Sequence, residues 1–119
     1  MAADDPLAEL LDLSEDVTAA VIFDREGAVA AATVGNEQAR AAADAAGGML
    51  AYAGALRQGP SVERVEAVTP EGGVYVLREG ERAIVATTGP DPAGPLVLHD
   101  LRECLRKSGS RPKRSRRAS

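Results

Sequence analysis

The chain has 119 residues, a mass of 12.3 kDa and a formal net charge of −4, a length that fits one domain. Hydrophobic residues make up 45% of it and aromatic residues 3%, which excludes a wholly disordered chain and predicts a core of small aliphatic side chains. No apolar stretch reaches the roughly 18 residues of a membrane-spanning helix, and the acidic start does not resemble a secretory signal. We therefore expect a soluble, cytoplasmic protein.

The first half of the chain predicts a short helix, a hairpin and a long helix. Proline and spaced leucines over residues 6–13 favour the first helix. Residues 17–23 have the length and β-branched content of a strand that is apolar on both faces, with Val17, Val21 and Phe23 on one side. A turn that ends at Gly27 leads to a second strand over residues 28–33. Alanines at spacings of three and four then predict an amphipathic helix over residues 37–58.

The second half predicts three strands and a closing helix. Residues 61–69 mix valines with charged side chains, which suits a half-solvated edge strand, and residues 74–79 and 82–88 are joined by a turn at Gly80. An apolar stripe over residues 95–107 predicts the last helix. Short links between strands favour antiparallel hairpins. We predict an α/β fold with a five-stranded antiparallel sheet, the long helix on one face and the two terminal helices on the other.

The charge of the chain is divided between a body and a tail. Residues 1–105 carry all 18 acidic residues against seven arginines, whereas residues 106–119 carry seven basic residues and no acid. Charges further apart than about 10 Å are screened from one another at 0.1 M salt. We predict a folded domain over residues 1–107 and a disordered basic tail over residues 108–119, with the cations Arg111, Lys113, Arg114, Arg116 and Arg117.

Two stretches of the sequence carry a family resemblance. The strand-turn-strand VIFDREGAVAAAT and the region REGERAIVATTGPDPAGPLVLHDLRE, set in this order of elements, resemble the roadblock / dynein light-chain family. The resemblance covers about residues 6–107 and implies a roadblock/profilin-like fold. It also implies a non-enzymatic module of the type found in bacterial regulators of Ras-like GTPases, which forms homodimers through the long helix and the strand after it.

The long helix has two interpretations. Gly47 and Gly48 lie in its middle, where each costs about 1 kcal/mol relative to Ala. Small side chains there either let a second polypeptide approach closely, or merely pack on the chain's own sheet, or mark a kink. For the edge strand there are also two interpretations. Its charged residues either protect it from pairing with other chains, or the strand pairs with the edge strand of a second copy in a dimer. The predicted dimer or partner interface comprises Arg40, Ala43, Gly47, Gly48, Ala51, Val62, Arg64 and Glu66.

The residues offer no recognisable catalytic, metal or cofactor site. No phosphate-binding loop of the form GxxxxGK[ST] is present, and a solvated side chain is the better interpretation of the single His99. Cys104 is the only cysteine, which excludes an internal disulfide framework, and it falls on an apolar stripe where a buried, inert thiol is expected. We therefore predict no enzyme, no cofactor and no metal.

Two functions remain, both for a homodimer. In the first, the protein is a regulator or scaffold that binds a small Ras-like GTPase and shifts its nucleotide state by differential affinity. In the second, it is an adaptor whose basic tail contacts nucleic acid or an anionic membrane. An excess of Arg over Lys and abundant Ala are typical of a GC-rich bacterial genome, which fits a role in bacterial signalling.

Overall fold

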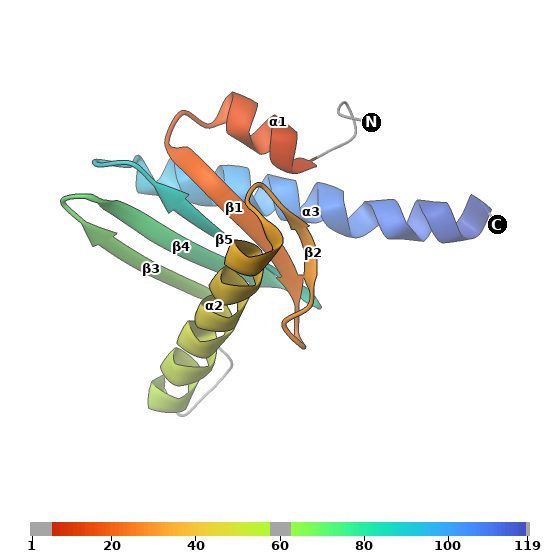
Figure 1. The fold of residues 1–119 in the computed structure, drawn as a ribbon, viewed down its shortest axis with the longest axis horizontal. Helices are drawn as coiled ribbons and strands as arrows, with labels where there is room; N and C mark the ends of the chain where they lie inside the picture. Colours follow the sequence, from red (N-terminus) through yellow and green to blue (C-terminus); the bar gives the residue numbers. More distant parts are fainter. Residues whose placement is uncertain (1–5, 58–62, 119) are drawn as a thin grey trace.

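Three helices and five strands make up the computed structural model, which describes residues 6–57 and 63–118, with side chains given as far as Ser108. Their order along the chain is α1 (Pro6–Leu13), β1 (Val17–Asp24), β2 (Val29–Ala32), α2 (Asn36–Arg57), β3 (Arg64–Thr69), β4 (Gly72–Glu79), β5 (Arg82–Thr88) and α3 (Gly94–Ala118). This order and the layer arrangement confirm the predicted fold (Figure 1).

All five strands form one antiparallel sheet in the order β2-β1-β5-β4-β3. The three predicted hairpins are present, and their tight turns include Gly27 at φ 88° and Gly80 at φ 64°, a left-handed backbone that glycine adopts without a steric cost. The long-range pairing of β1 with β5 joins the two halves at the centre of the sheet, with Val21 opposite Val85. Strands β2 and β3 are therefore the two edges.

The two faces of the sheet have separate cores. Ile22, Leu77 and Ile84 pack with the apolar stripes of α1 and α3, whereas Phe23, Val76 and Val85 pack beneath α2. Strands covered on both faces need apolar residues on both, which is why residues 19–23 of β1 and residues 83–86 of β5 are all apolar. Figure 1 shows α2 crossing one face of the sheet, with α1 and α3 on the other.

One prediction about β1 was wrong. Val17 was expected on the same face as Val21 and Phe23, but it belongs to the core beneath α1 and α3. The register of β1 against β5 shifts between Val17 and Ala19, and a bulge of this kind moves a side chain to the opposite face.

The closing helix is longer than the sequence predicted. The stripe favoured a helix over residues 95–107, whereas the backbone of α3 is helical as far as Ala118, where a disordered tail was expected. Gly109 and Pro112 lie within this extension, although both residue types disfavour the interior of a helix. Of the helices in the described ranges, none is long and apolar enough to cross a membrane.

Candidate interaction surface and adjoining pocket

The inward face of α2 packs on the sheet of its own chain. Ala39, Ala43, Ala46 and Leu50 are buried at helical spacing among the side chains of β1, β4 and β5. Ala43 is only 1% exposed, so it cannot form part of a surface for a partner, and the interface predicted there needs correction. Its small side chain instead lets the helix approach the sheet closely.

The outward face of α2 is apolar and uncovered. Exposed residues recur at spacings of three and four along it, and they are Ala41, Ala45, Gly48, Tyr52 and Leu56; we call this set the α2 stripe. Tyr52 is 69% exposed and Leu56 67% exposed. None of residues 51–56 of α2 is buried, and Figure 1 shows this end of the helix extending past the strands. A large aromatic and a large aliphatic side chain in solvent are typical of an interaction site.

The two glycines in the middle of α2 do not break the helix, which runs without interruption from Asn36 to Arg57. A Cβ atom added at Gly47 or Gly48 would meet no atom within 4 Å. Packing within the described part of the chain therefore does not explain why both positions lack a side chain.

Strand β3 is an edge strand, as the sequence predicted. Its residues alternate, so Val65 packs towards α2 while Arg64, Glu66 and Val68 lie on the other face, where they are exposed. Nε of Arg64 lies 3.4 Å from Oε2 of Glu66 in a surface ion pair. Val68 is 54% exposed. The strand thus presents one free edge and a partly apolar, uncovered face.

The other residues predicted for the interface and for the basic tail differ in how far the structure describes them. Arg40, Gly48 and Ala51 are exposed on α2, and Gly47 is half-buried. Val62 lies outside the described residues. The basic side chains predicted to act in the tail also lie beyond the described side chains; they are Arg111, Lys113, Arg114, Arg116 and Arg117.

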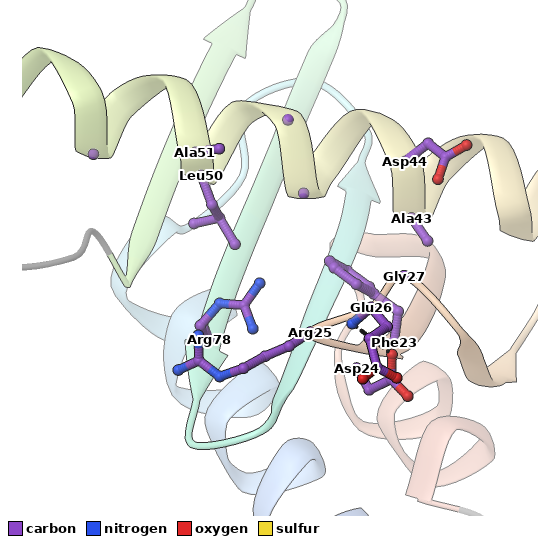
Figure 2. Close-up of a pocket in the computed structure, with 13 residues that line it drawn as sticks. Phe23, Asp24, Arg25, Glu26, Gly27, Ala43, Asp44, Leu50, Ala51 and Arg78 are labelled. Atoms are coloured by element: carbon purple, nitrogen blue, oxygen red, sulfur yellow. Dashed lines mark hydrogen bonds between the residues drawn. The ribbon is translucent and has the colours of Figure 1, made fainter.

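A pocket of about 590 Å³ adjoins the α2 stripe, between the helix and the end of the sheet (Figure 2). Its walls are the β1–β2 turn (residues 24–27), the small residues of α2 between positions 43 and 54, and Arg78 of β4. Burial lowers the pKa of Arg78, and the positive charge of Arg25 lowers it further. The lining of this pocket therefore contains two cationic side chains, Arg25 and Arg78, that repel each other.

Sequence reasoning missed three residues of this region. Leu56 fits the helical period of the buried alanines, but α2 has passed the sheet by that point. Tyr52 falls between the periodic alanines and received no role. Arg78 was assigned to a strand and received no role, because its place beneath α2 depends on a helix that is distant in sequence.

Two other candidates behave as the residue patterns predicted. His99 is exposed on α3, and the thiol of Cys104 is buried in the core between α1 and α3. Within the ranges that the structure describes, no group of three His, Cys, Asp or Glu side chains is placed to hold a metal ion.

Comparison with known proteins identifies the family and the fold. The sequence model of the Roadblock/LC7 domain family matches residues 3–88 of this chain. A Roadblock/LC7 domain from Streptomyces avermitilis has 16% sequence identity and a TM-score of 0.78, over 92% of this chain and 95% of that one. MglB of Myxococcus xanthus has 12% identity and a TM-score of 0.73, over 88% and 90%.

A third solved structure, described as MglB with a tetrameric arrangement, has 18% identity and a TM-score of 0.65, over 87% of this chain and 81% of that one. At these identities the structures establish a shared fold. No curated protein matches the sequence.

Proposed function

Because the chain belongs to the Roadblock/LC7 domain family, we propose that it is a cytoplasmic, homodimeric regulator or scaffold that binds a small Ras-like GTPase. Members of this family are generally non-catalytic regulators. The proposal gives the protein no catalytic step of its own. A dimer that binds one nucleotide state of the GTPase more tightly would shift the GTPase towards that state.

One observation carries the proposal: α2 has an uncovered apolar stripe, and the helix packs beside β3, a free edge of the sheet. Burying a large aliphatic or aromatic side chain contributes about 1.5–3 kcal/mol, so Tyr52 and Leu56, both more than two-thirds exposed, offer substantial binding energy to a partner. An unpaired edge strand offers backbone hydrogen bonds to a second copy. Together the two features suit a two-fold contact between copies of the chain.

The known structures add support for self-association. One fold relative is described as having a tetrameric arrangement, and Roadblock/LC7 domains with this fold include MglB from a bacterium. In the proposed dimer, Arg40 and Arg64 are exposed cations beside the contact. Any effect on GTP hydrolysis would come from positioning the partner's own catalytic residues.

Affinity capture from the native cell tests the GTPase partner. The tagged chain and its Leu56→Arg and Leu13→Arg variants serve as baits, because Leu13 is a matched exposed leucine, 72% exposed, on α1. We expect the unmodified chain and Leu13→Arg to retain a small GTPase that Leu56→Arg loses. Absence of any GTPase from the eluate of the unmodified chain would contradict the proposal.

The alternative function, a dimeric adaptor that binds nucleic acid or an anionic membrane through its basic tail, depends on a different part of the chain. It requires residues 109–119, whereas GTPase binding through α2 does not. Removal of that segment therefore separates the two functions.

A further inference from the structure

We propose that the pocket between α2 and the β1–β2 turn binds a small organic acid through a single carboxylate group, which pairs with Arg78. This inference does not require the proposed dimer or its GTPase partner, although Gly48 belongs both to the pocket lining and to the α2 stripe. It rests on the position of Arg78, on the space left by the helix above it and on the charges around it.

The register of the sheet places Arg78 under α2. Arg78 of β4 lies opposite Ala83 of β5, which in turn lies opposite Phe23 of β1. Ala83 and Phe23 belong to the core beneath α2, so Arg78 lies on the same face of the sheet. Figure 2 shows its side chain extending from β4 into the space below the helix.

The helix leaves room for a ligand above this arginine. Gly47 and Gly54 have no side chain, and Ala43 and Ala51 have small ones, so the pocket reaches about 590 Å³. That volume lies within the range of roughly 300–1,000 Å³ that is usual for sites of small molecules. Phe23 and Leu50 supply an apolar surface for the body of a ligand.

Nη1 of the half-buried Arg78 has no acceptor among the residues that the structure describes. The atom itself is buried. The other partly buried arginines are satisfied: Nη1 of Arg82 donates to Oγ of Ser108 at 2.7 Å, and Nε of Arg102 donates to Oε2 of Glu79 at 2.9 Å. Buried donors are almost always paired. An acceptor on a bound molecule would satisfy this Nη1.

Arg25 adds a second positive charge near Arg78. Arg25 also lines the pocket, and it lies close enough to lower the pKa of Arg78. Arg25 has only a loose partner, because its Nε lies 3.6 Å from Oε1 of Glu81 and both side chains are largely exposed. A carboxylate placed between the two guanidinium groups would accept charge-assisted hydrogen bonds and relieve their repulsion.

The acidic residues of the pocket lining favour a ligand with a single negative charge over one with two. Asp24, Glu26 and Asp44 also face the pocket. Oδ1 of Asp24 accepts hydrogen bonds from the backbone N–H groups of Glu26 and Ala28, so this carboxylate is held in the turn rather than on Arg78. A phosphate with two charges would be repelled by these three carboxylates, whereas a monocarboxylate balances the nearby arginines with less repulsion.

Titration with simple probes, followed by NMR of the isotopically labelled full-length chain, tests this site. The probes are sodium propionate, its neutral analogue propionamide and inorganic phosphate, all at constant ionic strength. We expect propionate to cause saturable shifts of the amide signals of residues 24–27 and 47–51. Propionamide should cause none, and phosphate should bind more weakly than propionate.

Three variants localise the binding. Arg78→Gln should weaken it about tenfold or more, and Gly47→Met should also weaken it, because it fills the pocket while keeping Arg78 and has open space around its Cβ. Arg40→Gln, an exposed arginine of α2 outside the pocket, should bind like the unmodified chain. Equal shifts with propionamide, tighter binding of phosphate, no saturable response, or unchanged binding in Gly47→Met would overturn the proposal, whether or not Arg78→Gln folds.

Discussion

Nε of Arg102 donates a hydrogen bond of 2.9 Å to Oε2 of Glu79, which ties the β4–β5 hairpin to α3. Arg106, one helical turn further along, donates to the other oxygen of the same carboxylate at 3.2 Å. One acidic side chain thus holds two turns of a helix against the end of the sheet. We call these two contacts of Glu79 the clamp. Arg78, which lines the proposed acid site, is the neighbour of Glu79 on β4 and lies on the opposite face of the sheet.

The clamp makes stability depend on pH. Burial raises the pKa of Glu79, but hydrogen bonds from Arg106 and Arg102 outweigh it, so the folded pKa is lowered below the ordinary value of about 4.3. Its contribution is therefore complete above that value and is lost as the pH falls through the folded pKa. Because Glu79 is about a third exposed, we expect Glu79→Gln to lower the free energy of unfolding by only about 0.5–1 kcal/mol at neutral pH.

Urea unfolding of both proteins at several pH values measures this difference, which should shrink as the pH is lowered from neutral through the folded pKa of Glu79. Glu81→Gln is the matched control, because Glu81 is largely exposed and has only a 3.6 Å ion pair with Arg25. A loss as large in Glu81→Gln as in Glu79→Gln would show that general surface charge, and not the clamp, sets the pH dependence.

Gly72 fixes the turn that positions the edge strand β3. Its φ of 154° is unfavourable for a residue with a side chain, and an added Cβ would overlap the carbonyl oxygen of Thr88. We expect Gly72→Ala to destabilise the fold by about 2 kcal/mol or more. Gly89→Ala should be nearly neutral, since a Cβ there meets no atom within 4 Å. Thermal unfolding of the two variants checks this, and equal melting temperatures would contradict it.

Removal of residues 109–119 separates the two proposed functions. The deletion begins after Ser108 because Ser108 is buried and Oγ of Ser108 accepts a hydrogen bond from Arg82, so the core of α3 is preserved. We expect the truncated chain to keep its mass in solution and its GTPase partner. Binding to vesicles rich in anionic lipid or to DNA, measured at two salt concentrations, should fall to background. Loss of the GTPase on truncation would instead assign partner binding to the tail.

Local patterns in the sequence were sufficient for most of the fold. Turn residues such as Gly27 and Gly80 mark the hairpins, and alanine spacing marks α2, because both signals depend on neighbours within a few residues. The pairing of β1 with β5 depends on contacts between distant segments, so no local pattern indicated it. The bulge that turns Val17 to the other face is likewise visible only in the paired strands.

The candidate site was predicted less well for the same reason. Helical spacing cannot tell where a helix passes beyond its sheet. Leu56 has the same period as the buried alanines but is 67% exposed, whereas Ala43, predicted in the interface, is buried. The place of Arg78 beneath α2 depends on a helix more than twenty positions earlier in the chain, so no local pattern indicated it. Edge position was predictable for β3 because its charged residues alternate with valines.

The α2 stripe should control assembly. Leu56→Arg places a charge where the proposed dimer buries a leucine, and loss of that burial alone should weaken the dimer about tenfold or more. Leu13→Arg makes the same change on α1 and should leave the mass in solution unaltered. Both leucines are exposed in the single chain, so neither substitution should unfold it, which circular dichroism verifies.

Sedimentation equilibrium of the unmodified chain, from low to high micromolar concentration, tests the proposed assembly most directly. We expect a mass of twice the 12.3 kDa chain, shifted towards a single chain by Leu56→Arg and not by Leu13→Arg. A single-chain mass at every concentration, or a dimer that Leu56→Arg leaves intact, would show that the exposed end of α2 is not where copies of this protein meet.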